Sequence, residues 1–144
     1  MTVKIASFWE LAWNTPILEV DLYQYPLEDF GVDEIYMHPI SGIDNKRIKE
    51  RNNLDEILAE NYDMTVVFVT DRAETKLVNF EHPDNALYIT GLTSHSDPSL
   101  TYVAEGRLSV CIETPNNQGG LWGHQALSIV LYDRIIKNGS NSNR

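Results

Sequence analysis

Residues 64–71, with the sequence MTVVFVTD, constrain the fold of this chain more than any other segment. Their centre is an almost unbroken run of β-branched and aromatic residues, which is typical of a strand buried on both faces. Strands of this kind belong to parallel sheets covered on both sides, because the connection between parallel strands is usually a helix. The segment therefore predicts an α/β fold.

The rest of the chain alternates between strand-like and helix-like segments. Further strands are expected at residues 3–8, 33–40, 86–91 and 108–113, and helices at 16–25, 54–61 and from Trp122 or Gly123 to about Lys137. This order predicts a mostly parallel sheet with helices on both faces. An unrelated flavodoxin-like α/β domain would show the same order, so the pattern alone does not give the function.

The length of 144 residues predicts one domain, which we place at residues 1–138, followed by a flexible tail at residues 139–144. The single cysteine, Cys111, lies in an apolar run and is expected to be a buried thiol in a reducing compartment. The N-terminus does not resemble a signal peptide, and no apolar run is long enough to span a membrane. These features predict a cytoplasmic protein.

The formal net charge of −10 opposes binding to phosphate backbones unless basic residues gather locally. They gather in one short run, at Lys46, Arg47, Lys49 and Arg51. Such runs are usually the solvated start of a helix. The alternative is a patch that contacts RNA phosphates.

Two polar, glycine-bearing loops follow two of the expected strands, at residues 91–100 and 114–120. Ligands of open α/β sheets bind just beyond the carboxyl ends of the strands. Although both loops also suit simple turns, their position favours a ligand pocket, since small residues let a backbone approach a ligand closely.

The segments NALYITGLTSHSDPSL (85–100) and LSVCIETPNNQGGLWGHQALSIVLYD (108–133) resemble the last two motifs of the SPOUT methyltransferases, in particular the SpoU-like RNA ribose 2′-O-methyltransferases. A weaker resemblance extends to residues 14–16 and 29–39. The resemblance implies an α/β sheet with a C-terminal trefoil knot, S-adenosylmethionine as cofactor, tRNA or rRNA as partner, and a homodimer. The residues that match the cofactor-binding loops of the family are Ile89, Gly91, Leu92, Ile112, Pro115, Gly120 and Leu121.

The chain departs from the family at residues that serve catalysis. Tyr25 stands where the family carries an arginine thought to activate the ribose hydroxyl, and Trp122 replaces an asparagine. These losses leave open an alternative function, a non-catalytic SPOUT-like dimeric binding protein. Substitute catalytic candidates are His95 and His124, which can act as bases near neutral pH, and Tyr25. Each also has a plain structural interpretation, the histidines as solvated loop residues and Tyr25 as a core residue.

Other cofactor classes receive no support from the sequence. No metal-ligand spacing, phosphate-binding P-loop or dinucleotide fingerprint is present. The last helix, in contrast, is apolar around most of its circumference, which is more than one core requires. We therefore expect the last helix and the helix at residues 16–25 to form a two-fold dimer interface.

Overall fold

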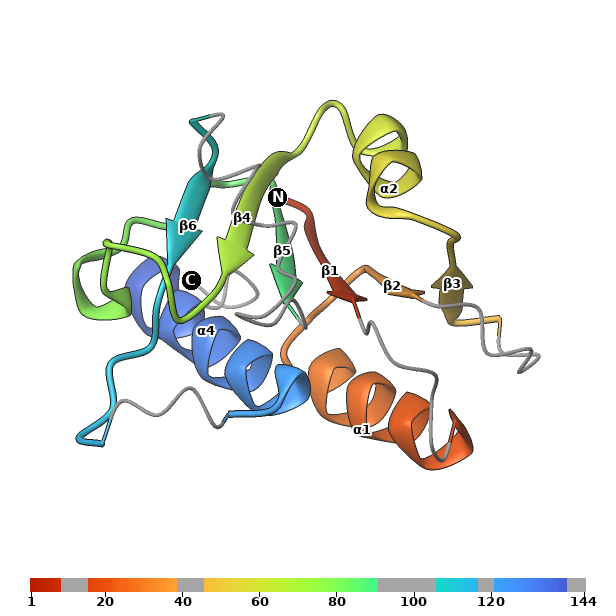
Figure 1. Cartoon of the computed structure of the whole chain (residues 1–144), viewed down its shortest axis with the longest axis horizontal. Helices are drawn as coiled ribbons and strands as arrows, with labels where there is room; N and C mark the ends of the chain where they lie inside the picture. The colour runs from red at the N-terminus through yellow and green to blue at the C-terminus, as the bar shows by residue number, and fades with distance from the viewer. Residues whose placement is uncertain (9–15, 39–45, 91–105, 117–120, 140–144) are drawn as a thin grey trace.

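The computed structural model of the chain describes residues 1–8, 16–38, 46–90, 106–116 and 121–139. Within them, six strands form one sheet in the order β3-β2-β1-β5-β4-β6, and every pairing is parallel (Figure 1). The strands are β1 (Val3–Phe8), β2 (Glu34–His38), β3 (Ile48–Glu50), β4 (Thr65–Val69), β5 (Ala86–Thr90) and β6 (Leu108–Val110). The predicted α/β fold with a parallel sheet is confirmed.

Helices cover both faces of this sheet, as the alternation of segments predicts. Helices α1 (Pro16–Asp29) and α4 (Gly123–Asn138) lie side by side on one face, and α2 (Leu54–Glu60) lies on the other (Figure 1). Two separate cores result, because successive residues of a strand point to opposite faces. Ile5 packs in the core shared with α1 and α4, whereas its neighbour Ala6 packs in the core beneath α2.

Two local predictions were wrong. The basic run does not start a helix: residues 48–50 form the edge strand β3, because Ile48 is buried against β2 while the charged residues beside it stay partly exposed. Helix α1 also continues past Pro26 to Asp29. A proline at this position removes one intrahelical hydrogen bond and crowds the preceding turn, yet the turn stays helical, and Leu27, the residue after Pro26, is fully buried in the core.

A buried polar network fixes α4 against the sheet. Arg134 donates to the Tyr88 hydroxyl at 3.1 Å and to the Pro83 and Asp84 carbonyls at 2.5 and 2.8 Å. The Tyr88 hydroxyl lies 2.7 Å from Nδ1 of His82, whose Nε2 lies 2.8 Å from Asp133. Burial lowers the pKa of His82 and outweighs the opposing effect of Asp133. Near neutral pH, the contact is therefore a hydrogen bond from a neutral imidazole.

The order of the strands places a topological switch point between β1 and β5. From β1 the chain builds outward through β2 to β3, and it then crosses to the far side of β1 to form β4, β5 and β6. Ser7 and Thr90 are register partners at the carboxyl ends of the two strands at this point. Open α/β sheets bind their ligands in such a crevice, so the fold directs attention to this edge of the sheet.

Candidate functional site

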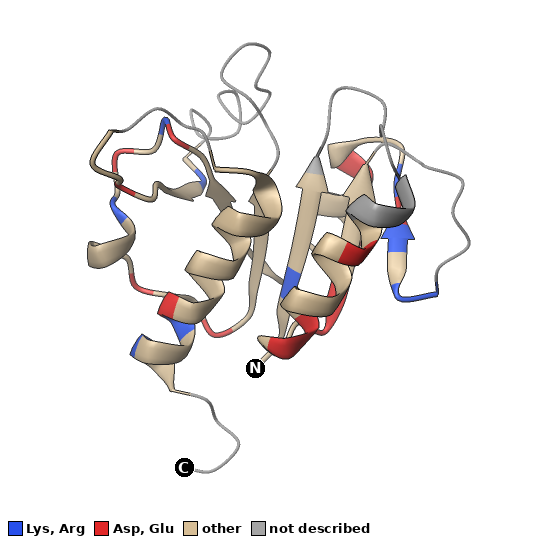
Figure 2. Cartoon of the chain, turned by 90° about the horizontal axis from the view of Figure 1, so that it is seen from below, with Lys and Arg blue, Asp and Glu red and all other residues tan. Residues whose placement is uncertain are grey.

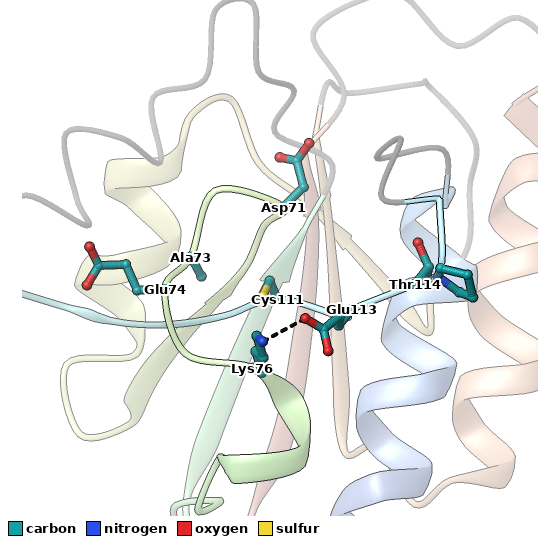
Figure 3. Close-up of a pocket in the computed structure, with 8 residues that line it drawn as sticks. Asp71, Ala73, Glu74, Lys76, Cys111, Glu113 and Thr114 are labelled. Atoms are coloured by element: carbon teal, nitrogen blue, oxygen red, sulfur yellow. Dashed lines mark ion pairs between the residues drawn. The ribbon is translucent and has the colours of Figure 1, made fainter.

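A pocket of about 700 Å³ lies beyond the carboxyl ends of β4 and β6 (Figure 3). Two chain segments form it, one between β4 and the 3₁₀ turn η1 (Leu77–Asn79) and one after β6. Backbone hydrogen bonds of 2.9 Å link them, from Cys111 N–H to the Thr75 carbonyl and from Leu77 N–H to the Cys111 carbonyl. The lining residues are Asp71, Ala73, Glu74, Lys76, Cys111, Glu113, Thr114 and Pro115.

The pocket carries more negative than positive charge. Lys76 and Glu113 point toward one another beside Cys111 and form an ion pair of 2.7 Å, while Asp71 and Glu74 add two more carboxylates (Figure 3). The hydrogen bond to Glu113 raises the pKa of Lys76, and burial raises that of the half-buried Cys111. Cys111 is therefore a protonated thiol rather than a nucleophile at neutral pH, and the carboxylates suit a ligand with cationic groups or hydroxyls.

Next to this pocket, α4 begins very close to the β1–β5 switch point. A Cβ atom on Gly123 would lie 2.3 Å from Tyr23 Oη of α1 and 3.1 Å from Thr90 Cγ2 of β5. Glycine is therefore needed here for the packing of three elements. The hydroxyl of Ser7, fully buried beside Thr90, makes no hydrogen bond within the described residues. Buried hydroxyls without a partner are rare and point to a bound water or ligand.

The first turn of α4 also carries an aromatic array. The His124 ring meets the buried Tyr23 ring edge-on, with centroids 5.7 Å apart, and the exposed Trp122 ring in the same way at 5.9 Å. The helix start is fixed by Gln125, whose side-chain oxygen accepts a 2.9 Å hydrogen bond from the Trp122 N–H. Three aromatic rings thus run from the core to the surface at the α1–α4 junction.

The predicted cofactor residues have mixed outcomes. Pro115 lines the pocket, Ile112 is half-buried two residues beyond β6, and Leu121 is exposed just before α4. The Ile89 side chain is fully buried beneath α2, so only its main chain is available to a ligand. The predicted residues Gly91, Leu92 and Gly120, together with the catalytic candidate His95, lie outside the described residues.

Tyr25 does not face the core, because 63% of it is exposed. The structural interpretation of this residue was therefore wrong. The sequence analysis also did not identify Asp71 and Glu74, the two acidic residues that line the pocket beside the Lys76–Glu113 ion pair. The sequence did offer a signal for them, since both residues lie in the segment that follows the buried strand β4, and ligands of such sheets bind beyond the carboxyl ends of the strands.

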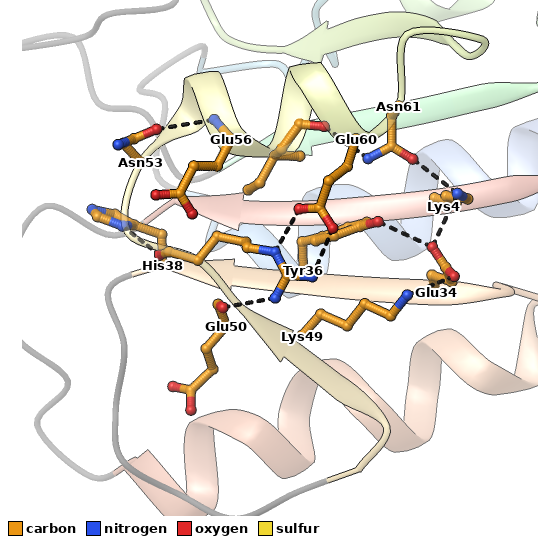
Figure 4. A network of polar contacts seen from close by, with 12 residues as sticks. Lys4, Glu34, Tyr36, His38, Lys49, Glu50, Asn53, Glu56, Glu60 and Asn61 are labelled. Atoms are coloured by element: carbon orange, nitrogen blue, oxygen red, sulfur yellow. Dashed lines mark hydrogen bonds and ion pairs between the residues drawn. The ribbon is translucent and has the colours of Figure 1, made fainter.

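The basic run is largely compensated by carboxylates. Lys49 pairs with Glu34 at 2.8 Å, and Arg51 pairs with Glu60 at 2.5 Å (Figure 4). Arg47 pairs with Glu28 on α1. Figure 2 shows the same mixture of charge around β3 and α1, whereas α4 is mostly uncharged. Three of the four residues predicted to contact phosphates thus already have an acidic partner.

Glu34 is the most strongly shifted carboxylate of this network. Burial works against its charge, but hydrogen bonds from Lys49, Lys4 and Tyr36 outweigh that effect and lower its pKa to about 2. Lys4 lies 3.0 Å from Glu34 and also donates to the Asn61 side chain at 2.8 Å (Figure 4). These contacts hold β1, β2, β3 and the end of α2 together, so the charged side chains of the network have a structural role.

Comparison with known proteins shows which solved structures share this fold. No family model and no curated protein sequence matches the chain. Solved structures do match: a candidate RNA methyltransferase from Bacillus anthracis shares 11% identity at a TM-score of 0.73, over 97% of this chain and 96% of that one. The SpoU methyltransferase AviRb from Streptomyces viridochromogenes, in complex with AdoMet, shares 11% identity at a TM-score of 0.72.

AviRb is the longer protein: the match covers 96% of this chain but 58% of that chain. A structure concerned with the 2-OH methylation of C/U34 on tRNA matches at a TM-score of 0.67 and 11% identity, over 95% of this chain and 97% of that one. Identities this low show the fold alone. None of the helices within the described ranges has the length and hydrophobicity of a membrane-spanning segment. The resemblance seen in the sequence is thus confirmed at the level of the fold: the chain has the fold of the SpoU-type RNA methyltransferases.

Proposed function

We propose that the chain is an S-adenosylmethionine-dependent RNA methyltransferase that acts on a ribose 2′-hydroxyl of tRNA or rRNA. The observation that carries the proposal is the position of the pocket, beyond the carboxyl ends of β4 and β6 in a sheet shared with RNA methyltransferases. The motif resemblance at residues 85–100 and 108–133 supports it from the sequence.

The described pocket suits S-adenosylmethionine chemically. Its volume of about 700 Å³ lies within the range of about 300–1,000 Å³ that small-molecule sites occupy. Carboxylates such as Asp71 and Glu74 complement the sulfonium and ammonium charges and accept hydrogen bonds from ribose hydroxyls. When bound, the methyl donor supplies an electrophilic methyl group, and the protein holds the RNA hydroxyl in line with it.

The proposal includes a knot and a dimer. The knot expected from residue 91 onward involves residues 91–105, outside the described part, and it stays a prediction. For the dimer, α4 buries Leu127, Val130 and Leu131 inward and exposes Ile129, Tyr132 and Ile136 on its outer face. An apolar outer face of this kind, on a helix that packs against α1 with its exposed Tyr25, suits a second copy of the chain.

The compensated basic run favours a second candidate function, the non-catalytic dimeric binding protein. Only Lys46 of the basic run has no carboxylate partner within the described residues, and the arginine of the family is absent. Transfer of tritiated methyl groups from S-adenosylmethionine to bulk tRNA and rRNA separates the two candidates. We expect incorporation above that of heat-denatured protein. Cofactor binding without incorporation into either RNA would favour the binding protein.

A further inference from the structure

The imidazole of His124 has the surroundings of a positioned base. It lies half-buried on the first turn of α4, held between the edge-on contacts of Tyr23 and Trp122. Within the described residues, neither ring nitrogen makes a hydrogen bond, although the backbone carbonyl of His124 accepts one from Ser128 at 2.8 Å. The ring is thus fixed by apolar contacts while its nitrogens stay available to a ligand.

Burial lowers the pKa of His124, and no neighbouring charge contributes to the shift. Tyr23 on α1 is the titratable group in ring contact with the imidazole, and Thr90 at the end of β5 is a neutral neighbour of this turn. At neutral pH the imidazole is therefore uncharged. A neutral imidazole has one nitrogen lone pair that can accept a proton.

The position of His124 relative to the sheet adds a second, independent observation. Gly123, the preceding residue, abuts Thr90, whose register partner is Ser7. The buried Ser7 hydroxyl makes no hydrogen bond within the described residues, at the switch point where ligands of such sheets bind. Because β5 lies beside β4, this place adjoins the side of the sheet that carries the pocket beyond β4 and β6.

We propose that His124 is the catalytic base that accepts the proton of the target ribose 2′-hydroxyl. This inference rests on the proposed function and adds a catalytic group where the arginine of the family is missing. The 2′-oxygen forms a bond to the methyl carbon as the bond from that carbon to sulfur breaks. The electron pair of the broken bond stays on sulfur, giving a neutral thioether, while the 2′-proton passes to His124 and then to solvent.

The test compares His124→Gln and His124→Phe with the wild type. Glutamine keeps hydrogen bonding and phenylalanine keeps the ring packing, but neither accepts a proton. His38→Gln is the matched control, because His38 lies at the end of β2 and contacts the Arg51 carbonyl instead. We expect S-adenosylmethionine binding by calorimetry to stay within about threefold for all variants. We expect kcat for RNA methylation to fall by about 10²- to 10⁴-fold in both His124 variants, the usual contribution of a general base.

Two further readouts separate catalysis from structure. Added imidazole should restore activity to the smaller of the two variants, His124→Gln, and the fall in wild-type kcat on acidification should disappear in both. In the ligand-free wild type, an NMR titration should give a His124 pKa below the ordinary value of 6.5. Absence of S-adenosylmethionine binding, or of methyl transfer to RNA, in the wild type would refute the proposed function on which this inference rests. If the wild type binds the cofactor and methylates RNA, equal kcat in the His124 variants or a His124 pKa above 7 overturns the base assignment alone.

Discussion

Replacing Gly123 by alanine tests whether α4 is held at the switch point by close packing. The added Cβ would lie 2.3 Å from Tyr23 Oη and 3.1 Å from Thr90 Cγ2, and Tyr23 is only 3% exposed, so its ring has little room to move. Overpacking of this kind costs about 1–3 kcal/mol. Alanine regains up to about 1 kcal/mol of helix propensity, and less at the first helical position. We therefore expect Gly123→Ala to lower the free energy of unfolding by about 1–2 kcal/mol.

A double-mutant cycle identifies the contact responsible. Tyr23→Phe removes the hydroxyl that the new methyl group would meet and leaves the ring carbon Cζ at 3.4 Å, an ordinary contact distance. In the Tyr23→Phe background, Gly123→Ala should lower the free energy of unfolding by less than about 0.5 kcal/mol. The new methyl group then keeps a tight contact with Thr90 Cγ2 but no longer meets a hydroxyl. Urea unfolding followed by fluorescence measures all four proteins. An equal cost of Gly123→Ala in both backgrounds, or no cost in either, would show that the start of α4 is not packed against Tyr23 as described.

Three further predictions concern stability and assembly. The pKa of Glu34 in the folded protein is lowered to about 2, so its stabilisation is present above the ordinary value of 4.5 and is lost as pH falls toward 2. In Glu34→Gln, urea unfolding should show a free energy of unfolding lower by about 1–2 kcal/mol at pH 7, with a weaker dependence on acid pH. The lowered pKa of His82 predicts stability that is full above pH 6.5 and falls below it, and urea midpoints at pH 7.5 and 5.5 should differ less in His82→Gln than in the wild type. Light scattering should report a dimer for the wild type and a monomer for Tyr132→Glu/Ile136→Glu, whereas a wild-type monomer at micromolar concentration would contradict the proposed interface.

Strong local signals made most of the fold predictable from the sequence. The β-branched run at residues 64–71 contains β4, and the expected strand at residues 3–8 coincides with β1. The edge strand β3 was missed because three residues with two charges give no periodic pattern, and pairing with β2 rather than intrinsic preference makes them a strand. Tertiary context decided this element.

The candidate site was predictable only in part, because its parts come from distant segments. Pro115 follows from its place after a strand, but no sequence rule pairs Lys76 with Glu113 or sets Ser7 beside Thr90. From the sequence, Gly123 is only a possible first residue of the last helix, whereas the structure gives it a packing role against two other elements. Such packing roles depend on contacts between helices and strands that are distant in the sequence and meet only in the folded chain.

Binding of S-adenosylmethionine to the purified protein is the most direct test of the proposed function. Titration calorimetry with S-adenosylmethionine and S-adenosylhomocysteine measures it without any choice of RNA. The carboxylates that line the pocket predict micromolar binding of S-adenosylmethionine, weakened in Asp71→Asn/Glu74→Gln, since two negative charges are removed from the lining of a site for a cationic ligand. A protein that folds normally but shows no binding heat with either compound at millimolar concentration would contradict the proposed function and leave the fold alone.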